Sequence, residues 1–158
     1  MKELAATAAA TVDATPEQCL ALLIAVDGYP NWYPEVVRHA EVIERDGAGK
    51  PSRARATVHV AVGPLVRDFD LPLAVSVSSL EVKLSRTPHE PSDPERFEIT
   101  WEIAPGPPTG LELRFEARLD VPRLLPVGSV GESLAQGFVD AASRALAGCS
   151  PNASASSS

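Results

Sequence analysis

The feature that most constrains the fold of this chain is an alternation of apolar and charged residues over 111–121. Every second residue from Leu111 to Val121 is apolar, and the residues between them are all charged. Residues 95–103 alternate in a similar way, with polar residues between the apolar ones. Because successive side chains of a β-strand point to opposite faces of the sheet, both segments predict strands with one buried and one solvated face. Strands of this kind are typical of an antiparallel sheet.

Five weaker alternations predict further strands over residues 4–14, 38–45, 53–62, 67–77 and 81–87. Pro72 lies inside the strand predicted at 67–77. Because proline has no backbone N–H to donate, we expect this strand to lie at the edge of the sheet or to carry a bulge. Residues 104–110 are rich in Pro and Gly and join the last two strands as a hairpin.

Residues 15–26 predict a helix with a well-defined start. Thr15 can accept a hydrogen bond from a free N–H of the first turn, Pro16 suits the first helical position, and Gln18 completes a capping box. Gly28 follows the apolar stripe of this helix and is expected to end it as a glycine C′ residue.

Two more helical segments are predicted. Pro30 and Pro34 leave room for a single helical turn, which carries Trp32 and Tyr33. A long amphipathic helix is predicted from about residue 127 to residue 146, with apolar residues along one side and polar residues along the other.

The predicted order is strand, helix, short helix, six strands and long helix. A sheet with one apolar face needs a cover on that face, and the last helix is the only long amphipathic cover that the sequence offers. We therefore expect an α+β domain over residues 1–147, in which a curved seven-stranded antiparallel sheet wraps around the C-terminal helix. Two short helices lie between strands one and two, and residues 148–158 are predicted to be a disordered tail.

Composition excludes several classes of function. The formal net charge of −7 argues against a nucleic-acid surface and against an anionic membrane surface, both of which require a basic patch. No run of 18 apolar residues and no signal-peptide core occur, so we expect a cytoplasmic protein without a transmembrane segment. The wealth of Ala, Arg, Val and Pro suggests a bacterial source. The two cysteines and three histidines are widely spaced, so no metal and no cofactor are expected.

Several local motifs agree with the predicted order of elements. They are VDATPE at 12–17, YPNWYP at 29–34, GPL at 63–65, and Trp101. On these motifs the chain resembles the polyketide cyclase/dehydrase and lipid-transport group of the START-like, Bet v 1-like (SRPBCC) superfamily. The resemblance spans residues 5–147 and implies the helix-grip fold of that superfamily. Its members include lipid and sterol carriers, coenzyme-Q-binding proteins, aromatase/cyclases and hormone receptors.

The resemblance also implies a cavity between the concave face of the sheet and the last helix. Its mouth is expected at residues 32–36, 62–66 and 123–127. The leading hypothesis is that a hydrophobic small molecule, such as a lipid, an isoprenoid or a polyketide-like compound, binds there without covalent chemistry. A monomer or a homodimer is expected. The predicted ligand-binding residues are Trp32, Tyr33, Val36, Val58, Phe69, Leu71, Trp101, Phe115, Leu134 and Phe138.

Plain core packing remains an alternative for the aromatic residues of this set. An empty protein with a cavity below about 100 Å³ would contradict the binding hypothesis, because ligand pockets measure several hundred Å³. A second hypothesis is a polyketide cyclase or dehydratase, in which Tyr33 positions a ketone. His59, Asp68 and Asp70 are expected to face water, so no catalytic residue other than Tyr33 is proposed.

A third hypothesis is a protein-interaction module. Leu65, Leu124 and Leu125 could together form an exposed apolar patch.

Overall fold

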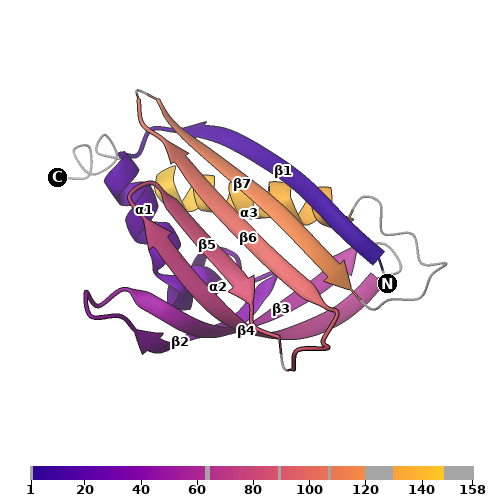
Figure 1. Ribbon diagram of the computed structural model, residues 1–158. Helices are drawn as coiled ribbons and strands as arrows, with labels where there is room; N and C mark the ends of the chain where they lie inside the picture. The colour runs from indigo at the N-terminus through magenta and orange to yellow at the C-terminus, as the bar shows by residue number, and fades with distance from the viewer. Residues whose placement is uncertain (1, 63–64, 89, 107, 120–129, 148–158) are drawn as a thin grey trace.

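The computed structural model describes residues 2–62, 65–88, 90–106, 108–119 and 130–147 (Figure 1). The elements are β1 (Lys2–Val12), α1 (Pro16–Ile24), the 3₁₀ turn η1 (Val26–Gly28), α2 (Tyr29–Trp32), β2 (Val37–Arg45), β3 (Pro51–Val62), β4 (Leu65–Ser78), β5 (Glu81–Arg86), β6 (Arg96–Ala104), β7 (Thr109–Leu119) and α3 (Val130–Ala147).

One antiparallel sheet contains all seven strands, in the order β1-β7-β6-β5-β4-β3-β2. β1 pairs with β7 without interruption, from Lys2 opposite Leu119 to Val12 opposite Thr109. The sheet curves around α3, and α1 and α2 lie at one end of it (Figure 1). The predicted fold, with two short helices between the first two strands, is confirmed.

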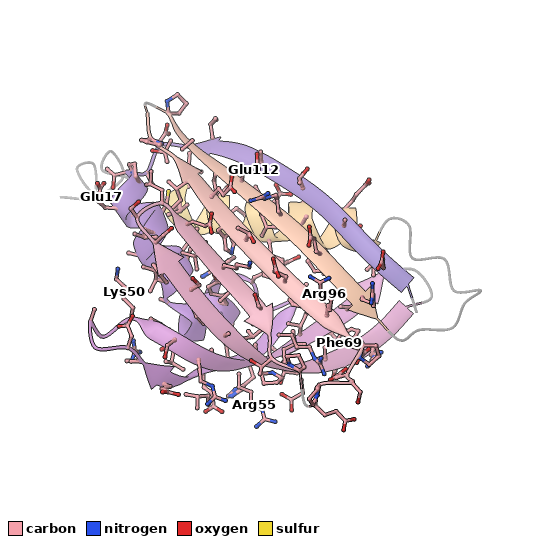
Figure 2. The ribbon with its side chains drawn as sticks, viewed as in Figure 1. Glu17, Lys50, Arg55, Phe69, Arg96 and Glu112 are labelled. Carbon is pink, nitrogen blue, oxygen red and sulfur yellow. The ribbon has the colours of Figure 1, made fainter. Side chains whose placement is uncertain are left out.

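The two faces of the sheet differ as the alternation predicts. Trp101 and Leu113 are fully buried on the inner face. Charged side chains such as Arg55, Arg96 and Glu112 extend from the outer face (Figure 2). Cross-strand ion pairs on that face include Arg55 with Asp70, at 2.9 Å between Nη2 and Oδ2.

The predicted outward carboxylates and imidazole are on this solvated face. Asp68 and Asp70 are exposed, and the His59 ring nitrogen Nδ1 lies 2.5 Å from Asp68 Oδ1. These groups interact with one another on the outside of the sheet and do not enter its interior.

The start of α1 is confirmed and its end differs from the prediction. Thr15 Oγ1 accepts a hydrogen bond from Gln18 N at 3.1 Å, and Gln18 Oε1 accepts one from Thr15 N at 2.9 Å. The helix ends at Ile24 and the chain turns through η1. Gly28 has a φ of −87°, so it is not a left-handed cap. Its N–H donates to the Ala25 carbonyl at 2.9 Å, which keeps the chain in a right-handed turn.

The expectation that Pro72 marks an edge strand or a bulge is wrong. β4 lies between β3 and β5, and its register with β3 is unbroken where Pro72 faces Arg55. The Pro72 carbonyl accepts a hydrogen bond from Thr87 N at 2.7 Å, just beyond the last β4–β5 pair. In a β-strand the N–H and the C=O of one residue point to the same side, so the N–H that Pro72 lacks would point past the end of β5. No β4–β5 ladder hydrogen bond is lost there, and an internal strand therefore tolerates the proline.

Several predicted features lie outside the described residues: the tail at 148–158, Leu124 and Leu125, the 123–127 part of the expected mouth, and the start of the last helix at 127–129. The expected mouth at 62–66 is described only in part. Within the described ranges, no helix is long and apolar enough to cross a membrane.

Candidate functional site

The predicted ligand-binding residues all contribute to the interior between the sheet and α3. Trp32 and Val36 are half-buried near α2. The other eight are buried: Tyr33, Val58, Phe69, Leu71, Trp101, Phe115, Leu134 and Phe138. Burial alone is equally compatible with a ligand wall and with a packed core, so the empty space among these residues decides how far the site is formed.

One interior void of about 20 Å³ lies between α3 and the β2–β6 part of the sheet. Its lining is Val26, Tyr29, Val37, Ala40, Ala56, Val58, Leu71, Leu73, Leu84, Phe97, Ile99 and Phe138. No charged side chain is among them. The only polar side chain is that of Tyr29, and its hydroxyl donates to the Leu23 carbonyl at 2.7 Å. The void is therefore apolar on every side.

Three of the predicted residues line this void, namely Val58, Leu71 and Phe138. The lining residues Leu84, Phe97 and Ile99 were not predicted as a site, although the same period-two alternation places them on the inner face. Tyr29 belongs to the YPNWYP motif but was assigned no role. Phe69 does not line the void, since the Arg67 guanidinium covers its ring with the carbon Cζ 4.3 Å from the centroid.

The void is closed in this conformation. A space of about 20 Å³ holds roughly one water molecule, whereas ligand pockets measure several hundred Å³. It is below the limit of about 100 Å³ at which a protein purified without a ligand would contradict the binding hypothesis. A ligand can occupy this region only if the surrounding side chains move apart.

A cluster of five aromatic rings forms one end of the interior. Trp32 lies 4.7 Å from Tyr29 and 6.5 Å from Trp101, measured between ring centroids. Phe138 of α3 lies 4.8 Å from Tyr33 and 6.3 Å from Trp101, with the rings edge to face in both pairs. The cluster joins α2, β6 and α3, and through Tyr29 and Phe138 it borders the void.

Tyr33 faces α3 and is not part of the void lining. A Cβ built on Gly137 would lie 2.0 Å from the Tyr33 hydroxyl oxygen, so the phenol occupies the space that a side chain at 137 would need. Burial, with a further contribution from the Glu35 carboxylate, raises the pKa of Tyr33 to about 12. At neutral pH the phenol is protonated, and it can donate a hydrogen bond but cannot act as a base.

Among the described residues, two buried indole nitrogens have no hydrogen-bond partner, Trp32 Nε1 and Trp101 Nε1. Leaving a buried donor unpaired costs roughly 1–3 kcal/mol, and such groups are rare in folded proteins. The two residues differ in exposure, since Trp101 is fully buried and Trp32 is half-buried. Burial also raises the pKa of the neighbouring Tyr29 phenol well above its usual range.

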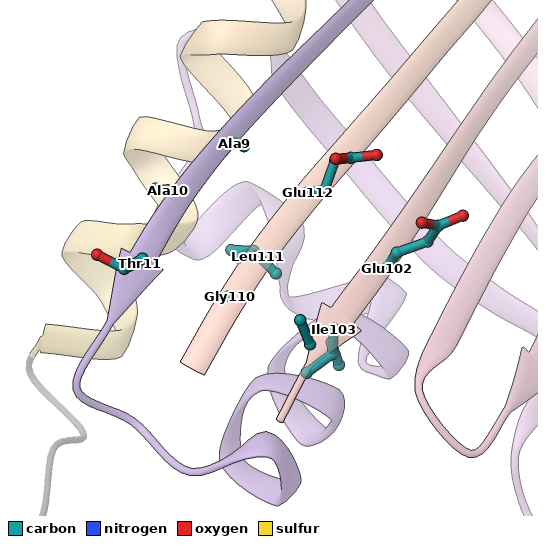
Figure 3. Close-up of a pocket in the computed structure, with 9 residues that line it drawn as sticks. Ala9, Ala10, Thr11, Glu102, Ile103, Gly110, Leu111 and Glu112 are labelled. Atoms are coloured by element: carbon teal, nitrogen blue, oxygen red, sulfur yellow. The ribbon is translucent and has the colours of Figure 1, made fainter. Parts of the chain in front are cut away.

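A larger hollow of about 490 Å³ lies at the surface, at one end of β1, β6 and β7 (Figure 3). Ala9, Ala10 and Thr11 line one side of it, and the cross-strand partners Glu102 and Glu112 line another. None of the predicted ligand-binding residues contributes to it. Among the described residues, no group of three or more His, Cys, Asp or Glu side chains could hold a metal ion.

The sequence profile described as polyketide cyclase / dehydrase and lipid transport matches residues 12–143. The chain belongs to this family. No curated protein sequence matches the chain.

Solved structures of other proteins show the same fold. A START superfamily protein from Mycobacterium smegmatis is 19% identical with a TM-score of 0.69, over 94% of this chain and 97% of that one. Major latex-like protein 151 from Panax ginseng is 7% identical with a TM-score of 0.64, over 94% and 98% of the two chains. The di-domain ARO/CYC StfQ from the steffimycin biosynthetic pathway is 16% identical with a TM-score of 0.59, over 91% of this chain and 45% of that one. At these identities the likeness concerns the fold alone.

Proposed function

We propose that this family member binds a hydrophobic small molecule of the lipid, isoprenoid or polyketide-like class between its sheet and α3. The observation that carries the proposal is the void whose lining is apolar on every side. Apolar cavities remain dry and bind apolar molecules, because a water molecule inside them finds no group on the wall with which to form hydrogen bonds. Membership of a family described as lipid-transport and cyclase proteins agrees with it.

The packing of α3 is uneven in a way that favours expansion of the void. α3 packs mainly along β1 and β7. The void lies on the other side of the helix, toward β3 and β4, where the small side chains of Ala40 and Ala56 leave space. A movement of the Phe138 ring would therefore enlarge the void without disturbing the contacts of α3 with β1 and β7.

The expected affinity follows from the buried apolar area. Burial of a methylene group contributes about 0.8 kcal/mol, so on the order of ten buried carbons correspond to micromolar binding before the cost of ordering the ligand and opening the site. We therefore expect ligands larger than about ten carbons.

A substitution that fills the void tests the proposal. Ala56 lines the void on β3, and Ala56→Val adds two methyl groups there. Ala61 lies on the same strand but is exposed, so Ala61→Val is the matched control. A titration with the neutral apolar probe N-phenyl-1-naphthylamine should show weaker binding to Ala56→Val and unchanged binding to Ala61→Val. Equal binding to both variants and the wild type would place the probe elsewhere and contradict the proposal.

A second candidate function is cyclisation or dehydration of a poly-ketone, with Tyr33 positioning a carbonyl by donating a hydrogen bond. The description of the family and the fold likeness to an ARO/CYC protein favour it. The Tyr33 hydroxyl would have to turn from Gly137 toward the interior. Tyr33→Phe should abolish product formation from a reactive poly-ketone, and unchanged turnover would exclude this role.

A further inference from the structure

The indole N–H of Trp32 is a buried donor without an acceptor among the described residues. Nearly all buried polar groups in folded proteins have a partner, so an orphaned donor beside a candidate ligand site indicates that the ligand supplies the acceptor. The Trp101 indole N–H is also unpaired, but Trp101 is fully buried on β6, whereas Trp32 is half-buried on α2. Trp32 is therefore the residue of the pair that a ligand can reach more easily.

The position of Trp32 connects the surface with the void. The residue is half-buried on the short helix α2. Its ring packs against Tyr29, which lines the void. A ligand whose oxygen is at Trp32 can therefore extend its apolar part past Tyr29 toward Val58 and Leu71.

The lining of the void offers no partner for an anion. Tyr33 stacks beside Trp32, at 6.4 Å between ring centroids, and burial keeps its phenol protonated by raising its pKa to about 12. No charged group lines the void.

A cation does lie at the inner face farther along β4. The Arg67 guanidinium covers the Phe69 ring, and its Nη2 is 3.5 Å from Glu95 Oε2. Arg67 does not line the void, and its charge is opposed by Glu95. Among the described residues that line the void, none carries a positive charge to pair with a buried carboxylate.

We infer that the ligand is an uncharged apolar molecule with a hydrogen-bond-accepting oxygen, and that the Trp32 indole N–H donates to this oxygen. The inference rests on the proposed function and narrows its ligand class. Trp32 is then a specificity residue, because it selects a ketone, quinone or ether over a hydrocarbon of the same shape. The uncharged lining of the void disfavours the corresponding carboxylate.

Three tricyclic probes with one skeleton test the inference. Fluorene has a methylene group where 9-fluorenone has a carbonyl, and fluorene-9-carboxylate has an anion at the same carbon. The chain contains two tryptophans, so its ¹H–¹⁵N spectrum has two indole N–H signals, and Trp32→Phe assigns them by loss of one. Trp101→Phe removes the other signal and so confirms the assignment.

We expect 9-fluorenone to bind roughly three- to tenfold more tightly than fluorene, the gain typical of one net hydrogen bond. It should move the Trp32 indole proton downfield. Trp32→Phe should remove the preference, while Ala61→Val at an exposed position of β3 should keep it. The spectrum of the wild type reports the bond even if a variant folds poorly.

The other outcomes separate the inference from the proposed function. Equal binding of fluorene and 9-fluorenone, with the Trp32 signal unmoved, overturns the inference and leaves the proposed function standing. Carboxylate binding as tight as that of the ketone overturns the requirement for an uncharged ligand. If no probe binds and no apolar molecule co-purifies with the protein, the proposed function fails and the inference fails with it.

Discussion

The hydroxyl of Tyr33 on the loop after α2 lies in the space where a side chain of residue 137 on α3 would be. A Cβ added to Gly137 would be 2.0 Å from the phenol oxygen and 3.0 Å from the ring carbon Cζ that carries it. Gly137 therefore gives the Tyr33 phenol the space to pack against α3. Any movement that opens the interior at this end must change this contact.

Gly137→Ala should destabilise the protein although alanine is the better helix former. In an exposed helix the change would gain about 1 kcal/mol, but here the ring of Tyr33 must be displaced, which costs about 1–3 kcal/mol. Urea unfolding measures the difference. Gly131→Ala in the same helix is the control, since its Cβ would meet neighbours only at 3.6 Å or more, an ordinary contact distance. If both variants are equally stable, the Tyr33 contact does not constrain α3.

Phe138→Ala should cost about 3–5 kcal/mol of unfolding free energy, the usual loss for a large aromatic side chain removed from a core. Phe138 is 1% exposed and packs edge to face on Tyr33 and Trp101. Chemical denaturation gives the value. A much smaller loss would mean that Phe138 is a loosely packed cavity wall, and the variant should then bind bulkier ligands without a large loss of stability.

Stability should fall as the pH rises from about 10 to about 12. An exposed tyrosine ionises near pH 10, whereas the pKa of Tyr33 in the folded protein is about 12. The unfolded chain therefore loses its proton first, so the stability that Tyr33 contributes is complete below pH 10 and is lost as the pH approaches 12. Tyr29 shifts in the same direction because it is buried.

Absorbance of tyrosinate at 295 nm follows both tyrosines during a pH titration. We expect little tyrosinate in the folded wild type at pH 11 and nearly full ionisation in urea at that pH. Tyr33→Phe should reduce the loss of stability between pH 10 and pH 12. Ionisation of both residues near pH 10 in the folded protein would show that neither phenol is protected by burial.

Thr15→Ala should destabilise the protein by about 1 kcal/mol, because the N–H of Gln18 loses the acceptor that caps α1. Thr15→Ser keeps an acceptor oxygen and should remain close to the wild type. Thermal unfolding of the three proteins makes the comparison. An equal loss for serine and alanine would assign the effect to the threonine methyl group.

The sequence was sufficient to predict the strands and helices, but not the size of the space between the sheet and α3. Period-two alternation identifies all seven strands, and the inner face from Phe97 to Ile103 follows from it directly. The capping box at Thr15 involves only residues that are close in the sequence, so it can be predicted from the sequence equally well. The prediction for Pro72 was wrong because an internal strand tolerates a proline only where the neighbouring strand has ended. Where β5 ends is a property of the assembled sheet.

The candidate site was predictable in its composition and not in its volume. The apolar character of Val58, Leu71 and Phe138 follows from their positions on inner faces. Whether these side chains leave a ligand-sized cavity depends on rotamers and on the distance of α3 from β3 and β4, which no local pattern encodes. The direction of the Tyr33 hydroxyl depends in the same way on Gly137, a residue more than 100 positions away.

The central claim is that the interior between the sheet and α3 takes up an apolar molecule. Native mass spectrometry of the protein purified from its own host tests this most directly. The account predicts an additional mass that leaves on denaturation and belongs to an uncharged hydrophobic compound, with less of it retained by Ala56→Val than by Ala61→Val. A protein that carries only its own mass, together with an interior that stays near 20 Å³ when apolar probes are added, would contradict the account.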